Sequence, residues 1–458
     1  MGRMDSTSSL GESVRAWFSQ RALTFKIAGV SLLALLLLIP LGMVRSTLSE
    51  RHVRYRETVG SITQTWGGSQ QLFGPVLIVP YVHRTEVSEW TESNGKRLLE
   101  KKIHETKAEA IFLPERLEIN GTIDPSTRQR GIYITHVVTA KAVLKGRFAK
   151  PDLGFLGLEG IEPQWKFARV EVGVSDLRGV RETITLRWGA NSVAMQPGIS
   201  CCGSKTGVYA PVVISEGDGT EFALDLNLNG STGFKVVPLG KETQVRLASS
   251  WADPSFNGAF LPTQRQVSAK GFEASWEVSF YGRNFPQQWS YRHSERPPKE
   301  SEFAAAAFGV ELMENINAYR VIERAIKYGV LFIALVFATF FLFEAASGLR
   351  LNALNYLLVG AALCLFYLGL LALAEFWRFG AAYCVAAVAS LSLVGSYSTA
   401  ILRTRSRAFL VCGLLALVYG YLYLILQLED YALLAGTVAL FMALAAVMWV
   451  TRHIKSAP

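Results

Sequence analysis

Hydrophobic residues are distributed unevenly along this chain. A continuous apolar run, Ile27 to Val44, lies near the N-terminus, and a series of apolar runs begins at Tyr328. The first run is long enough to span a bilayer, and no Ala-x-Ala cleavage signal follows it. We therefore predict an uncleaved anchor helix over residues 24–45, with a cleaved signal peptide as the alternative. The polar stretch between the runs indicates a water-soluble domain over residues 46–327.

The anchor pattern continues into a helix outside the membrane. Apolar residues recur at helical spacing at Tyr55, Val59, Ile62 and Trp66. The Gly67-Gly68 pair that follows is typical of a helix C-terminus, and we predict that the helix stops there.

The stretch from Val310 to Glu344 joins the soluble domain to the later apolar runs. Its first half has the pattern of a charged amphipathic helix, in which Glu323 precedes Lys327 by four residues and is placed to form an ion pair. Its apolar face comprises Val321, Ile322, Ala325 and Ile326, and its cationic face Arg320, Arg324 and Lys327. The uncharged second half predicts a transmembrane helix over residues 328–344.

Short β-branched segments separated by turn residues fill the soluble domain. The first, Leu72–Val82, contains two prolines and suits an edge strand or a strand with a bulge. Asn94-Gly95 lies between two runs of strand length and predicts a hairpin. Further strands are predicted at Glu109–Leu113, Ile132–Leu144, Phe167–Val174, Glu182–Trp188, Val208–Ile214, Glu221–Leu228, Thr243–Ser249 and Glu273–Tyr281, and turns at Asn120-Gly121, Asp124-Pro125, Asp218-Gly219, Asn229-Gly230, Asp253-Pro254 and Asn257-Gly258. This pattern predicts an antiparallel, sandwich-like β-rich domain with helical flanks.

Four further apolar spans follow the joint, so we predict six transmembrane helices in total. The four spans lie at about 356–373, 379–402, 408–426 and 432–450. Arg403, Arg405 and Arg407 crowd one short loop, whereas Glu429 and Asp430 occupy the next. The positive-inside rule then puts the arginine loop in the cytoplasm. Both tails, 1–23 and 452–458, are predicted to be cytoplasmic and the β-rich domain extracytoplasmic.

Composition agrees with a membrane protein. Of 458 residues, 50% are hydrophobic and only 18% are charged, and the mean hydropathy is +0.25. The net charge of +9 does not indicate nucleic-acid binding, because no basic stripe is interleaved with aromatic residues. Of five cysteines, three lie in apolar spans; Cys201 and Cys202 are adjacent, and either form a vicinal disulfide or remain free thiols.

The sequence contains no recognisable catalytic, metal or cofactor motif. The histidines His52, His83, His104, His136 and His293 are scattered through the soluble domain. The most site-like cluster places Ser175, Asp176 and Arg178 within four residues. We interpret it as a turn in which Asp176 bonds local backbone amides, because a serine nucleophile needs a base and no histidine is paired with it by spacing. No cofactor or metal is therefore expected.

Several long segments carry a resemblance to a known family. They are WGGSQQLFGPVLIVPY (Trp66–Tyr81), VGVSDLRG (Val172–Gly179), WADPSFNGAFLP (Trp251–Pro262), Phe308–Phe332 and Leu354–Glu375. In these segments the chain resembles the CreD family of bacterial inner-membrane proteins. The resemblance implies a large periplasmic domain, a C-terminal membrane bundle and a role in cell-envelope integrity and the envelope-stress (β-lactam) response. It implies no catalytic residue.

Three functions remain open from the sequence. The first is a non-enzymatic envelope protein of the inner membrane, whose periplasmic domain contacts a periplasmic or cell-wall partner. The second is a hydrolase or transferase acting through the Ser175–Arg178 loop. The third is a lipid or solute conduit, although mid-span ionisable residues, which transporters need, are missing. The lipid bilayer is the expected partner of Arg320, Arg324 and Lys327, with ion pairs to the soluble domain or a solvated face as the alternatives. The sequence specifies no oligomeric state.

Overall fold

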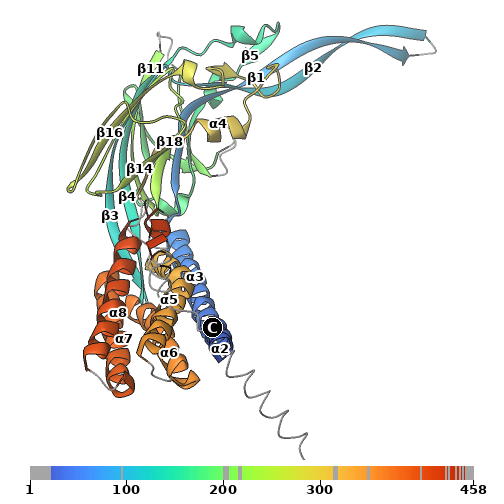
Figure 1. Ribbon diagram of the computed structural model, residues 1–458. Coiled ribbons are helices and arrows are strands. Elements are labelled where there is room, and N and C mark those ends of the chain that lie inside the picture. The colour runs from blue at the N-terminus through green and yellow to red at the C-terminus, as the bar shows by residue number, and fades with distance from the viewer. Residues whose placement is uncertain are drawn as a thin grey trace, which may run out of the picture. The chain divides into compact units, whose positions relative to one another are not determined.

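The computed structural model describes residues 22–93, 96–199, 206–214, 219–312, 318–347, 351–402, 405–428, 431, 434–438, 441, 442, 445 and 448. The chain divides into two units (Figure 1). A helical unit comprises Met1–Arg56 and Ile316–Pro458, and a β-rich unit comprises Glu57–Asn315. Cys201, Cys202 and the predicted Asn94-Gly95 turn lie outside the described residues.

The helical unit follows the apolar pattern closely. Its helices are α2 (Ala22–Leu36), α3 (Leu38–Trp66) up to Arg56, α5 (Ala318–Ser347), α6 (Ala353–Ala374), α7 (Phe379–Leu402) and α8 (Arg405–Gln427). The rest of α3, from Glu57, belongs to the β-rich unit. Within the described part of the chain, four helices are long and apolar enough to cross a membrane: Lys26–Trp66, Ala353–Ala374, Phe379–Ile401 and Arg405–Gln427. Helix α5, which carries the predicted span 328–344, is not among these four, so the count of six transmembrane helices stays a prediction. The predicted span 432–450 lies mostly outside the described residues.

Small residues let the helices pack closely. A side chain at Gly360 would collide with Leu37, and one at Gly395 would lie 2.8 Å from the sulfur of Cys412. Both glycines therefore act as helix contacts, in the manner of small residues in membrane bundles. The bundle core is not wholly apolar, because Glu344, Ser390 and Ser398 are also buried.

The β-rich unit is built from two sheets that share one hydrophobic core (Figure 1). The first contains β1 (Gln70–Ser93), β2 (Lys96–Phe112), β5 (Ile161–Pro163), β6 (Arg169–Val174), β9 (Gln196–Pro197), β10 (Gly207–Pro211), β12 (Gly233–Val236), β14 (Pro254–Gly258), β17 (Gln288–Trp289) and β18 (Phe308–Leu312). The second runs in the order β15 (Gln264–Ser268), β16 (Gly271–Ser279), β13 (Glu242–Ser249), β3 (Arg116–Arg130), β4 (Tyr133–Ala149), β11 (Gly219–Gly230), β7 (Thr185–Trp188) and β8 (Asn191–Ala194). Short helices lie in the connections between these strands: η1 (Leu153–Leu156), η2 (Trp165–Phe167), η3 (Leu177–Gly179), η4 (Phe280–Gly282) and α4 (Glu300–Ala306). The β-rich prediction is confirmed.

The prediction of purely antiparallel sheets is wrong in two places. Strand β1 pairs with β12 in parallel, and β3 pairs with β13 in parallel. Both pairs join segments far apart in the sequence, so no tight turn dictates their relative direction. The predicted irregularity in the first strand is confirmed, because the pairing of β1 with β6 shifts register between Phe73 and Val76.

Two predicted turns are also wrong. Asn120-Gly121 and Asp124-Pro125 lie inside the continuous strand β3, which pairs with β4 from Arg116 to Arg130. The glycine has a packing role, because a side chain at Gly121 would lie 2.8 Å from Leu247 of the neighbouring strand. Pairing along the whole strand has overridden the local turn preference.

The joint begins with a strand that the sequence pattern missed. Val310 belongs to β18, which pairs with β12 on one side and β14 on the other. Phe308 and Val310 are fully buried there. Helix α5 begins at Ala318, so only the later part of the Val310–Glu344 stretch is the predicted helix.

Candidate functional site

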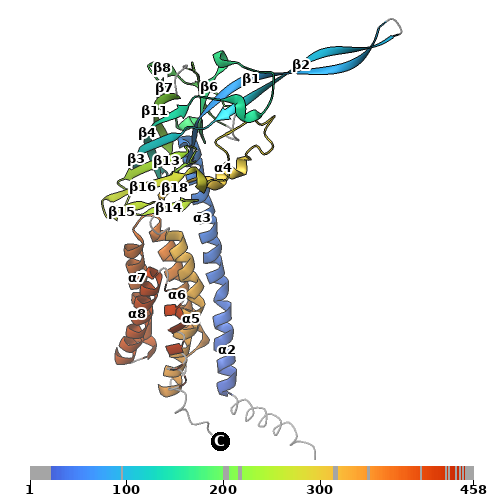
Figure 2. The same ribbon diagram turned by 90° about the horizontal axis from the view of Figure 1, so that it is seen from above.

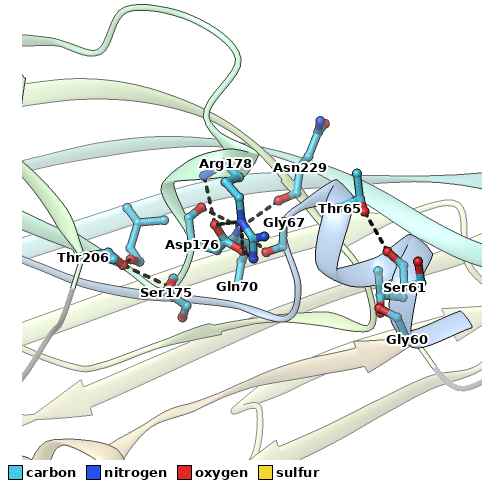
Figure 3. A network of polar contacts seen from close by, with 12 residues as sticks. Gly60, Ser61, Thr65, Gly67, Gln70, Ser175, Asp176, Arg178, Thr206 and Asn229 are labelled. Atoms are coloured by element: carbon cyan, nitrogen blue, oxygen red, sulfur yellow. Dashed lines mark hydrogen bonds and ion pairs between the residues drawn. The ribbon is translucent and has the colours of Figure 1, made fainter. Parts of the chain in front are cut away.

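The Ser175–Arg178 cluster forms a turn between β6 and η3. The Asp176 carboxylate accepts a hydrogen bond from the Arg178 backbone N–H at 2.9 Å and forms an ion pair with the Arg178 guanidinium at 2.7 Å (Figure 3). The hydrogen bond from this guanidinium holds the pKa of Asp176 below its usual value. The carboxylate therefore caps its own turn, as the sequence interpretation predicts.

The Ser175 hydroxyl is tied to the backbone of β1. Its oxygen accepts from the Gln71 N–H at 2.8 Å, and the hydroxyl donates to the Gln71 carbonyl at 3.3 Å. Within the described residues, neither Ser175 nor Asp176 forms a hydrogen bond with a histidine. This geometry supplies no base for a serine nucleophile.

The same turn helps to close the C-terminus of α3 onto the sheets (Figure 3). Gln70 is 1% exposed, and its Nε2 lies 2.7 Å from the Gly67 carbonyl oxygen, 2.8 Å from that of Asn229 and 3.2 Å from that of Asp176. Gly67 has a φ of +124°, and a side chain there would lie 2.7 Å from the Asn229 oxygen. The predicted glycine stop is confirmed, and only glycine fits it. We call Trp66, Gly67, Gln70, Asp176 and Asn229 the α3 junction.

Two arginines pack against Trp66 in the last turn of α3. Arg128 and Arg181 lie 4.1 Å and 5.0 Å from the centre of the Trp66 ring. With the Asn229 amide oriented so that its nitrogen donates to Thr139, its oxygen accepts from Arg181 Nε at 2.6 Å. Cation–π contacts and buried hydrogen bonds together fix this helix end in the β-rich unit.

The amphipathic part of α5 has the predicted faces. Its apolar residues Val321, Ile322, Ala325 and Ile326 are all buried. Lys327 and Glu323 form the predicted ion pair at 3.0 Å. Arg324 lies 3.4 Å from the Leu426 carbonyl oxygen at the end of α8, where a helix end carries partial negative charge. Arg320 is exposed.

Ion pairs link the anchor helix to later helices of the helical unit, and the sequence did not reveal these pairings. The buried Glu344 carboxylate forms an ion pair with Lys26, accepts from the Leu351 N–H at 2.8 Å, and accepts from the Tyr356 hydroxyl at 3.0 Å. Arg51 of α3 lies 3.6 Å from Glu375, just after α6. The only signal in the sequence was that these charges flank apolar runs, which does not identify partners.

A two-stranded ribbon projects from the β-rich unit (Figure 2). Strands β1 and β2 pair continuously from Leu77–Phe112 to Ser93–Lys96. Beyond Arg84, β1 has no described strand partner except β2. Val87 and Ile103 are 39% and 63% exposed, and the ion pair of Lys101 with Glu86 at 3.0 Å is solvent-exposed. We call the part of β1 and β2 beyond Arg84 the ribbon.

Comparison with known proteins covers both units. The family model described as "Inner membrane protein CreD" matches residues 22–456. The chain is 34% identical over 426 residues to Inner membrane protein CreD of Escherichia coli (strain K12), an alignment that covers 92% of this chain and 90% of that protein. The segments that carried the resemblance thus lie in one match across the chain, and the chain belongs to the CreD family of inner membrane proteins.

Proposed function

We propose that this inner-membrane protein supports cell-envelope integrity without catalysing a reaction, under envelope or cell-wall (β-lactam) stress. Its β-rich unit would lie in the periplasm and use the ribbon to contact a periplasmic or cell-wall partner. The observation that carries the proposal is the ribbon itself. An isolated two-stranded ribbon is marginally stable in water, and its free edges offer backbone donors and acceptors to another molecule.

The α3 junction supports a mechanical role for this contact. Helix α3 runs unbroken from Leu38 to Trp66, and its end is held by buried hydrogen bonds at Gln70. A load on the ribbon would therefore be passed to the C-terminal end of α3. Arg320, an exposed cation of α5, would in turn meet an anionic lipid headgroup and contribute about 1 kcal/mol near a charged leaflet.

Shortening the ribbon tests the proposal. Replacing residues 85–105 by an Asn-Gly turn should leave the protein inserted and abundant but lower cell survival under a β-lactam. A milder test compares the double variant Val87→Ser, Ile103→Ser in the ribbon with Val213→Ser elsewhere on the β-rich unit. Only the double variant should lower survival if the ribbon surface contacts the partner. Unchanged survival with the shortened ribbon would remove the ribbon from the function.

The orientation is tested by cysteine labelling in a background without native cysteines. Ser88→Cys in the ribbon should react with a membrane-impermeant thiol reagent in cells with a permeable outer membrane, whereas Ser406→Cys should not. Labelling at position 406 alone would mean that the arrangement is inverted.

The absence of catalysis is tested at Ser175. Because its hydroxyl bonds only backbone groups in the described contacts, Ser175→Ala should retain protein level and envelope phenotype. A Ser175→Ala protein that is folded and abundant yet inert would favour the hydrolase or transferase.

A further inference from the structure

Two segments far apart in the sequence place a cluster of polar side chains at the base of the ribbon. The Tyr81 hydroxyl lies 2.9 Å from Ser290 Oγ and 2.6 Å from His293 Nδ1. The His83 and His293 rings meet edge-to-face, with centres 5.3 Å apart. Tyr81 and Ser290 are fully buried, so they orient the imidazole from inside. Because Nδ1 is engaged, Nε2 is the His293 nitrogen left for an outside ligand.

The charges in this cluster are all of one sign. Burial, followed by the positive charge of His83 and Arg292, lowers the pKa of His293. Burial raises the pKa of Tyr81, against the influence of Ser290 and Arg292. No carboxylate contributes to either shift. The neighbouring carboxylates of Glu105 on β2 and Glu162 on β5 instead pair with Arg84, at 2.9 Å and 2.7 Å.

The residues of this cluster favour an anionic ligand over a metal cation or a serine nucleophile. A metal cation is disfavoured, because Arg292 repels it and, among the residues that the structure describes, no group of three His, Cys, Asp or Glu side chains could hold a metal ion. A serine nucleophile is disfavoured, because Ser290 is buried away from any substrate. Two imidazoles in contact, with the positive charge of Arg292 acting on His293 and no described carboxylate bonded to either ring, suit an anionic ligand.

We propose that His83, Arg292 and His293 form a binding site for an anion with carboxylate or phosphate oxygens, with the buried Tyr81 orienting His293 from inside. The site is independent of the proposed envelope function, because it requires no partner at the ribbon. Protonation of the His293 imidazole adds a donor and a positive charge, so the anion binds more tightly as the pH falls. Bound anion also relieves the repulsion between the protonated His293 ring and Arg292.

Calorimetric titration of the full chain in detergent tests this site, with acetate and inorganic phosphate as separate probes at about pH 6 and about pH 8. At constant ionic strength, wild type should bind at least one probe about tenfold more tightly at the lower pH. Acetate stays ionised at both pH values, and phosphate loses charge on acidification, so tighter binding reports protonation of the protein. Preference for one probe assigns the ligand as carboxylate or phosphate.

Arg292→Gln and His83→Gln should each lower the affinity, and His293→Gln should abolish the pH-dependent gain. The matched control is Arg296→Gln, in the same segment, because that guanidinium lies 3.2 Å from Glu302. Its affinities should equal those of wild type. Equal binding at both pH values, or equal loss in Arg292→Gln and Arg296→Gln, would overturn the site. Thermal unfolding at about pH 8 checks the fold, and if Arg292→Gln unfolds, His83→Gln decides the outcome.

Discussion

The two halves of β1 differ sharply in what surrounds them. From Leu72 to Val79 the apolar side chains of the core are at most 5% exposed. The strand pairs there with β6 on one side and, from Leu77 onward, with β2. From Arg84 to Ser88 every side chain is exposed. The inner half is held by burial of apolar surface, whereas the outer half has only its ladder with β2 and exposed ion pairs. The inner half of β1 thus belongs to the hydrophobic core, and its outer half belongs to the projecting ribbon.

If burial separates the halves, Leu77→Ala should destabilise far more than Val87→Ala. Leu77 is fully buried, and such a truncation costs about 2–5 kcal/mol in the free energy of unfolding. Val87→Ala should stay within about 0.5 kcal/mol, as exposed substitutions do. Urea unfolding of the full chain in detergent, followed by tryptophan fluorescence, measures both. Similar losses would mean that the ribbon packs on something the chain itself provides.

A second variant asks whether the α3 junction stabilises the inner end of β1. Gln70→Ala leaves the carbonyl oxygens of Gly67 and Asn229 without their buried donor, and we expect a loss of about 1–3 kcal/mol. Gln264→Ala, at an exposed strand position, is the control. If the two variants unfold at the same urea concentration, the junction does not hold the helix end.

Burial of a charged side chain lowers stability, and Arg283 is such a residue in the β-rich unit. Its guanidinium is buried, donates to Gln287 and lies 4.5 Å from the centre of the Phe285 ring, but Nε and Nη1 have no described hydrogen-bond partner. Burial lowers its pKa to about 10. Because a buried charge with two unpaired donors is costly, Arg283→Met should stabilise the β-rich unit by about 1 kcal/mol. The exposed Arg265→Met should change nothing, and a large loss in Arg283→Met alone would reveal an unrecognised partner of the guanidinium.

The smallest expected effect concerns pH at the boundary between the halves. His293 has a lowered pKa in the folded protein, so the unfolded chain takes up the proton at higher pH than the folded chain. The free energy of unfolding should be level above about pH 6.5 and fall on acidification, by at most about 1.4 kcal/mol per pH unit for one proton. Unfolding in phosphate-free buffer measures this slope, and His293→Gln should reduce it. An identical slope in the variant would place the titration elsewhere.

The sequence by itself determined the elements whose signal is local. The apolar run predicted at 379–402 is α7 with those bounds, and the runs at 356–373 and 408–426 lie inside α6 and α8. The buried face of α5 and the glycine stop of α3 also follow from spacing and residue type. So does the turn at Asp176, whose partner is only two residues away. Hydrophobicity and short-range hydrogen bonding are sufficient in these places.

Only the tertiary structure decided which distant segments meet. It paired β1 in parallel with β12 and kept Asn120-Gly121 inside a strand. It brought Lys26 to Glu344, and Tyr81 to His293, a partner 212 residues away. A residue's own sequence neighbourhood carries no record of such a partner, because the contact depends on sheet order, register and helix packing over the whole chain. For that reason the histidines looked scattered in the sequence, although two of them lie together at the base of the ribbon.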